Sequence, residues 1–212
     1  MNFKKIFYAF FAGMLGIFAF APFSIKFLIF ASYAYLIYIL IYSKGTQIKE
    51  VFAWGFGHWG FGMSWIIVSV YYYGETSIAI SSLIYLLLTI ILTVVFTLPL
   101  LFTSYINNNV NIDHKVFKIL FVSSSLMLSE ISREYLLNGV PWLIPGNIYL
   151  DTISQNIYPI LGASSTSFLI YILCSYLVVF MKNRKINVLG FGLILLSIFP
   201  QQPKLEEGEL LI

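Results

Sequence analysis

Long apolar runs separated by short polar connections dominate the sequence. Seven runs stand out, at residues 6–21, 25–42, 51–71, 77–104, 116–135, 158–181 and 186–199. A helix that crosses the hydrocarbon core of a bilayer needs about 20 predominantly apolar residues, and most of these runs have that length. An open sheet cannot pair its backbone groups in lipid, so the spans are predicted to be helices. The pattern predicts an all-α integral membrane protein, a polytopic bundle of about seven transmembrane helices.

The seventh run is the shortest, and it stops at Pro200. Fourteen helical residues rise about 21 Å, less than the roughly 30 Å of hydrocarbon. Two alternatives stay open for it: a span whose ends are sheltered by other helices, or a partial span. We expect residues 1–200 to form one transmembrane domain, and 201–212 to be a short polar tail that begins a truncated linker.

Composition narrows the class of protein further. Apolar residues make up 59% of the 212, and charged residues only 10%, whereas soluble domains carry about 25% charged residues. Little of the chain is left for a water-soluble catalytic domain. The run near the N-terminus is followed by Pro22 and a second apolar run, which favours a first membrane helix over a cleaved signal peptide.

The positive charges predict which side of the membrane each connection occupies. Nine lie on one side and three on the other, and such an excess is typical of the cytoplasmic side. The N-terminus is therefore predicted to be cytoplasmic, and seven spans would place the C-terminus outside. The nine are Lys4, Lys5, Lys44, Lys49, Lys115, Lys118, Lys182, Arg184 and Lys185, and the three are Lys26, Arg133 and Lys204.

A glycine-rich stretch marks the third run. Small residues let membrane helices approach closely, so these glycines are predicted to pack helices together. The stretch is no phosphate loop, because it lies inside a span and lacks the Lys-Ser/Thr ending. Trp65 and the tyrosines 71–73 fit an aromatic belt at the outer interface. The glycines are Gly55, Gly57, Gly60 and Gly62.

Glu130 and Arg133 are three residues apart near the outer end of the fifth run. This spacing places both on one face of a helix. One interpretation is an ion pair that fixes the helix against the following loop, and the other is a polar contact near a lipid headgroup or substrate. We hypothesise that the pair orders the loop at residues 139–147.

The connection at residues 136–157 is apolar but rich in prolines and glycines. Pro141 and Pro145 make a regular span improbable there. We predict an interfacial or re-entrant loop on the outer side that lines a cavity. The simpler alternative is a plug at the membrane surface, anchored by Trp142.

Candidate catalytic chemistry is sparse. One cysteine excludes a disulfide framework and a cysteine zinc site, and two histidines are too few for a histidine-rich metal centre. Cys174 has no nearby histidine in sequence and is interpreted as a small buried hydrophobe. His58 is expected to make one hydrogen bond, and Ser164, Ser165 and Ser167 to pack their helix. The net charge of +3 is spread over the connections, so no nucleic-acid partner is expected. We predict no catalytic residue, no metal site and no cofactor.

In this order, these features resemble the apolipoprotein N-acyltransferase family. The resemblance rests on the turn at 21–23, the glycine-rich helix leading to a tryptophan, a Glu and an Arg before Gly-x-Pro-Trp, and a final Gly and Ser-Phe. It implies a bacterial inner-membrane, multi-pass protein. It also implies acyl transfer from a phospholipid to the N-terminal cysteine amine of a lipoprotein, through a Glu-Lys-Cys triad in a nitrilase-like domain. The matching residues are Gly55, Gly57, Gly60, Gly62, Trp65, Val68, Ser69, Gly74, Glu130, Arg133, Gly139, Pro141, Trp142, Gly146, Gly162, Ser167 and Phe168.

The sequence departs from the family where the nitrilase-like domain should begin. No residue matches the triad, and Cys174 falls in the membrane part, so the chain is expected to be inactive alone. The expected partners are membrane phospholipid, a lipoprotein substrate and a separately encoded nitrilase-like domain. An equal alternative to such a separate domain is that the chain is the remnant of a truncated gene. The competing hypothesis is a non-enzymatic lipid-binding, scaffold or transport protein. The predicted lipid or substrate groove comprises Trp65, Glu130, Arg133, Pro141 and Trp142.

Overall fold

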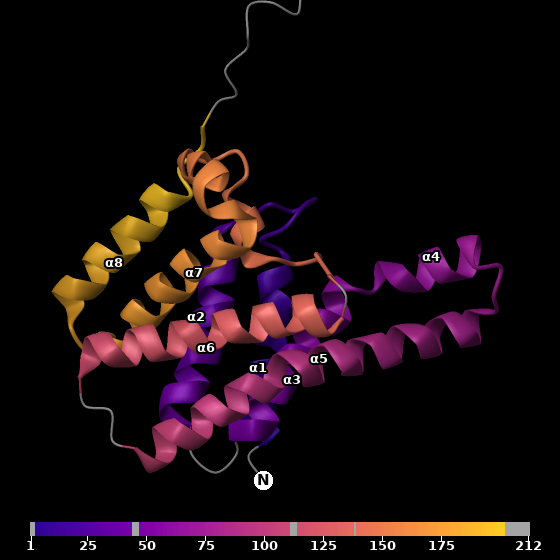
Figure 1. The fold of residues 1–212 in the computed structure, drawn as a ribbon, viewed down its shortest axis with the longest axis horizontal. Coiled ribbons are helices and arrows are strands. Elements are labelled where there is room, and N and C mark those ends of the chain that lie inside the picture. Colours follow the sequence, from indigo (N-terminus) through magenta and orange to yellow (C-terminus); the bar gives the residue numbers. More distant parts are fainter. Residues whose placement is uncertain (1–2, 44–46, 111–113, 138, 202–212) are drawn as a thin grey trace, which may run out of the picture.

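The computed structural model describes residues 3–43, 47–110, 114–137 and 139–201, and this part of the chain is predominantly helical (Figure 1). Within it there are eight α-helices, two short 3-10 helices and no strand, which confirms the predicted all-α class. An isolated bridge joins Thr152 to Pro200. The elements are α1 (Phe3–Ile17), α2 (Phe27–Tyr42), α3 (Gln47–Gly62), α4 (Trp65–Tyr73), α5 (Ile78–Asn109), α6 (Lys115–Leu136), η1 (Pro145–Tyr149), η2 (Ile153–Ile157), α7 (Tyr158–Val179) and α8 (Arg184–Ser197).

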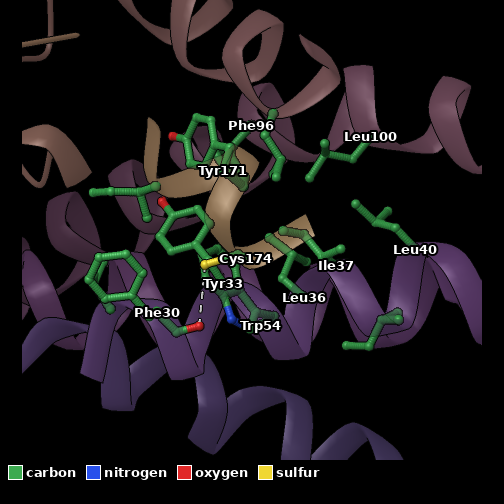
Figure 2. Close-up of a cluster of buried hydrophobic side chains, with 14 of the residues drawn as sticks. Phe30, Tyr33, Leu36, Ile37, Leu40, Trp54, Phe96, Leu100, Tyr171 and Cys174 are labelled. Atoms are coloured by element: carbon green, nitrogen blue, oxygen red, sulfur yellow. Dashed lines mark hydrogen bonds between the residues drawn. The ribbon is translucent and has the colours of Figure 1, made fainter. Parts of the chain in front are cut away.

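Large aromatic side chains fill the core between α2, α3 and α7 (Figure 2). Tyr33 packs edge-on against Trp54 at 5.0 Å between ring centroids and contacts Tyr171 at 5.2 Å. The indole N–H of Trp54 donates to the carbonyl of Ser32 at 3.2 Å, so its one polar atom is paired. Burying rings of this size supplies much of the packing in such a bundle.

Two glycines allow α1 and α3 to meet backbone to backbone. A Cβ at Gly13 would overlap the carbonyl of Trp54, and one at Gly57 would overlap the carbonyl of Phe10. Any larger residue would therefore push the helices apart. This is the close approach that small residues permit between membrane helices.

The prediction of one helix over residues 51–71 is wrong. The chain breaks after Gly62, and α4 then runs beside the beginning of α5, away from the other helices (Figure 1). At the break, Met63 is fully buried and the Ser64 hydroxyl donates to the carbonyl of Phe61 at 2.9 Å. A serine that bonds back to the preceding turn competes with helix continuation. Apolar residues continue through the break, so hydropathy does not reveal it.

The other boundaries differ from the prediction only at their ends. The first helix stops at Ile17 rather than at residue 21, because turns begin before Pro22. The helix through Pro99 continues to Asn109. The connection at 136–157 contains η1 and η2 and no regular span in its described residues, as its prolines predicted.

Two described helical segments are long and apolar enough to cross a membrane by length and composition. They are Ile78–Asn107 and Ile153–Val179, and Phe27–Tyr42 is a shorter apolar helix. Length and apolar composition are what a bilayer-crossing helix requires, so these segments are consistent with a membrane bundle.

Candidate functional site

A polar network is buried between α6 and α7. Arg133 Nη2 lies 3.7 Å from Glu130 Oε1, and both side chains are only 3% exposed. The Ser167 hydroxyl donates to Glu130 Oε1 at 3.2 Å, and the Tyr171 hydroxyl donates to the other carboxylate oxygen. Buried charges are stabilised when they are both paired and hydrogen-bonded, and Glu130 meets both conditions.

The network continues into the loop that follows α6. Arg133 Nη1 donates to the carbonyls of Val140 and Trp142, the latter at 2.8 Å. The guanidinium also lies over the Trp59 ring, 5.0 Å from its centroid, as in a cation–π contact. One side chain therefore ties the loop to the interior of the bundle.

A second set of hydrogen bonds fixes the loop where η1 begins. The backbone N–H of Gly146 donates to Ser167 Oγ at 2.9 Å, and the Tyr158 hydroxyl donates to the carbonyl of Gly146 at 2.7 Å. A Cβ at Gly146 would overlap the carbonyl of Ala163. Only glycine therefore lets η1 pack directly on α7.

The fixed loop forms one wall of a groove of about 900 Å³. Trp142 meets Trp65 edge-to-face, with ring centroids 5.4 Å apart, and the two indoles are 43% and 45% exposed. Most of the remaining lining is apolar. The lining residues are Ile17, Ala19, Phe20, Ala21, Ser24, Ile25, Lys26, Phe27, Gly62, Trp65, Trp142, Leu143, Asn147, Ile148, Leu150, Asp151, Ile198 and Pro200.

Opposite charges occur together at one part of the groove. The Lys26 ammonium donates to the carbonyl of Leu150. Desolvation by burial lowers the pKa of Lys26, while the carboxylate of Asp151 acts in the opposite direction and raises it. A partly desolvated cation beside an anion gives this groove a polar end among apolar walls.

The structure separates the five predicted groove residues into two groups. Trp65 and Trp142 line the groove, whereas Glu130 and Arg133 are buried behind its wall and Pro141 is exposed in the same loop without lining it. Arg133, which the charge count places on the outer side, is buried within the bundle.

Three participating side chains were not predicted as site residues: Ser167, Tyr171 and Lys26. Ser167 was expected only to pack its helix, but it bonds both Glu130 and Gly146. Ser167 and Tyr171 are four residues apart and so share a helix face. That polar pair on an apolar helix was the available signal.

The predicted packing glycines lie against different neighbours. Gly57 meets α1, Gly55 faces Thr93 of α5, and Gly62 faces Leu143 in the groove wall. The carbonyl of Gly60 accepts a hydrogen bond from the Tyr85 hydroxyl at 2.7 Å.

The remaining candidates offer no reactive arrangement. Cys174 is fully buried and its thiol faces the carbonyl of Phe30 at 3.5 Å (Figure 2). His58 Nδ1 lies 3.3 Å from the carbonyl of Gly13. Among the described residues no cluster of three or more histidine, cysteine or acidic side chains could hold a metal ion.

The described residues thus define an all-helical protein with an apolar groove, whose wall is fixed by a buried polar network. The chain belongs to the apolipoprotein N-acyltransferase family, because residues 12–176 match the family model for the apolipoprotein N-acyltransferase N-terminal domain. This confirms the family that the motif order predicted.

Curated relatives named apolipoprotein N-acyltransferase support this membership. The chain is 30% identical to the protein of Haemophilus influenzae over 158 residues, which cover 74% of this chain and 29% of that relative. Identity to the Haemophilus ducreyi protein is 33% over 192 residues, covering 85% and 36%. For Pasteurella multocida it is 28% over 204 residues, covering 92% and 38%. The chain therefore spans only about a third of the length of these relatives.

Proposed function

We propose that this chain is the membrane part of an acyl-transfer system and that its groove holds the phospholipid acyl donor. The protein would lie in the bacterial inner membrane as a multi-pass bundle with a cytoplasmic N-terminus. The observation that carries the proposal is the groove of about 900 Å³ beside Trp65 and Trp142. Its family membership supplies the reaction class.

The chemistry of the groove suits a lipid with a polar head. Binding sites for small molecules are mostly apolar with a few placed polar groups. Here the aromatic rings of Trp65 and Trp142 offer contact area for acyl chains, while Lys26 and Asp151 supply charges at one part of the lining. Tryptophans of this kind favour the membrane–water interface, where a headgroup lies.

The transfer step needs a nucleophile that the described residues do not offer. Acyl transfer through a thioester requires an activated thiolate with a neighbouring base. Cys174 is buried against the carbonyl of Phe30 and has no such base among its described contacts. We infer that a nitrilase-like domain bearing Glu, Lys and Cys, as the family resemblance implies, performs the chemistry on a lipid that this bundle presents.

The groove is tested with a phospholipid that carries a photoreactive diazirine on one acyl chain. After illumination in vesicles, we expect labelled peptides from residues 139–151 and 17–27, the two segments that supply most of the groove lining. Trp142→Ala should reduce this labelling several-fold. Tyr72→Ala serves as the matched control, because Tyr72 is 69% exposed and lies outside the groove. Uniform labelling that neither variant changes would refute the donor groove.

The assignment to acyl transfer is tested separately with a lipoprotein acceptor. Co-expression with a nitrilase-like domain should give transfer, and the purified 212-residue chain alone should give none. Transfer by the chain alone that survives Cys174→Ala would overturn the proposed division of labour. Substrate-dependent flux in vesicles, without transfer in either arm, would favour a transport protein instead.

A further inference from the structure

A second groove lies on the other part of α1, where this helix packs against α3. Its volume is about 1010 Å³, and it shares no lining residue with the Trp65–Trp142 groove. The second groove begins at Phe3 and reaches Phe11, whereas the first begins at Ile17. The two grooves therefore lie toward opposite ends of α1. The lining residues of the second groove are Phe3, Lys4, Ile6, Phe7, Tyr8, Phe10, Phe11, Phe52, Ala53 and Phe56.

Aromatic rings dominate this second groove. Phe7 and Phe11 contact each other with ring centroids 4.5 Å apart, and Phe10 meets Phe11 at 5.4 Å. Phe7 is 59% exposed and Phe52 is 37% exposed in the described chain. Contact of these exposed rings with an apolar occupant is favoured over contact with water.

The charge of the second groove is of one sign. Among the described residues that line it, Lys4 alone is charged, and it lies in the first turn of α1 with Lys5 exposed beside it. The lysine end is predicted to face the cytoplasm, where membranes present anionic headgroups that attract basic side chains. An occupant with an apolar body and a negative head complements both features.

We propose that the second groove binds one anionic phospholipid of the cytoplasmic leaflet. Its acyl chains lie along the phenylalanines of α1 and α3, and its phosphate lies beside Lys4. A volume of about 1010 Å³ is at the upper end of the range for ligand pockets, which suits an occupant as large as a lipid. The site is separate from the donor groove and depends only on the orientation proposed above.

Native mass spectrometry of the full chain tests this site. The protein is reconstituted with equal amounts of phosphatidylglycerol and phosphatidylcholine, then released from detergent while retained lipids are counted. Beyond any lipid held in the Trp65–Trp142 groove, we expect one phosphatidylglycerol per chain to be retained in preference to phosphatidylcholine, and Trp142→Ala should leave this lipid in place. Lys4→Gln should weaken this preference about five-fold, the effect of one lysine near an anionic surface. Lys185→Gln removes an equal charge from an exposed position on α8 and should leave the preference unchanged.

A second variant keeps the charge and fills the space. Ala53 lines the groove from α3, so Ala53→Phe should displace the lipid while Lys4 stays in place. Retained helical circular dichroism and photolabelling of the donor groove would show that this variant folds. The proposal is overturned if both lipids are retained equally, if Ala53→Phe retains phosphatidylglycerol as the original chain does, or if the groove is covered by a second copy in a lipid-free dimer.

Discussion

At the scale of single residues, the Glu130–Arg133 pair accounts for much of the geometry of the Trp65–Trp142 groove. Neither side chain lines that groove, yet Arg133 holds two carbonyls of the loop that does. Glu130 forms the ion pair with Arg133, and the hydroxyl groups of Ser167 and Tyr171 donate hydrogen bonds to Glu130. Removing one member of a buried ion pair typically costs about 3–5 kcal/mol, because it leaves the other charge uncompensated. The pair thus acts on the groove through the loop.

Replacing Glu130 by glutamine should loosen that loop. Glu130→Gln leaves the Arg133 charge without its partner, so we expect destabilisation of about 3 kcal/mol and faster proteolysis within residues 139–147. Limited proteolysis in membranes, read by mass spectrometry, measures the cleavage rate. Glu134→Gln is the matched control, since Glu134 carries the same charge on the same helix but is exposed. Equal cleavage in the two variants would disprove the role of the pair.

A glycine substitution tests the contact between α1 and α3. In Gly57→Ala the new methyl group would overlap the carbonyl of Phe10, and overpacking of this kind typically costs about 1–3 kcal/mol. Thermal unfolding of the detergent-solubilised protein should show a lower midpoint. Gly192→Ala is the control, because a Cβ there meets nothing within 4 Å and alanine favours a helix. A Gly57→Ala midpoint equal to that of the control would contradict the close approach.

At the scale of elements, the turn after Gly62 has the largest consequence. It directs α4 along the first part of α5 and brings Trp65, the first residue of α4, to Trp142. Tyr85 of α5 then bonds the carbonyl of Gly60, just before the break. The break thus forms one rim of the groove, and α5 is fastened to the end of α3.

Tyr85→Phe should remove the hydrogen bond that joins α5 to the end of α3. Loss of one hydrogen bond costs about 1 kcal/mol, and we expect faster hydrogen exchange in α4 and the first turns of α5. Tyr105→Phe lies on the same helix but is 67% exposed, so its exchange should match the original protein. If hydrogen exchange in α4 is identical in both variants, the hydrogen bond from Tyr85 to the carbonyl of Gly60 does not stabilise α4.

The sequence predicts elements well where one physical signal dominates. Apolar runs located seven of the eight described α-helices, all but the separate α4, and Pro141 and Pro145 excluded a regular helix between α6 and α7. The spacing of Glu130 and Arg133 correctly placed them on one face. These signals are local, and each depends on only a few neighbouring residues.

Contacts between residues far apart in the sequence, and a helix break inside an apolar stretch, could not be predicted from local patterns. Ser167 and Tyr171 meet Glu130 across separations of 37 and 41 residues, which no local pattern encodes. The break at Met63 lies inside an apolar stretch, so hydropathy continues across it. The contact of Lys26 with the carbonyl of Leu150 was not predicted either, because the two residues are 124 positions apart in the sequence.

At the scale of the whole molecule, the proposed orientation assigns the two grooves to opposite sides of the membrane. The second groove ends at Lys4 on the lysine-rich side, and the Trp65–Trp142 groove lies toward the other end of α1. Lys182 connects α7 and α8, and Tyr73 ends α4. If the N-terminus is cytoplasmic, the first of these residues faces the cytoplasm and the second faces outward.

Single-cysteine labelling measures this orientation directly. Cys174 is fully buried, so the original chain should react little with a membrane-impermeant maleimide. We expect Tyr73→Cys, at a position 89% exposed, to be labelled in intact cells from which the outer membrane has been removed. Lys182→Cys should be labelled only after the inner membrane is opened. The reverse pattern would invert the orientation and move the proposed donor groove to the cytoplasmic side, where lipoprotein acylation by an outward-facing domain could not use it. Labelling of both positions from one side would instead show that the number of membrane crossings between α4 and α8 differs from the one proposed.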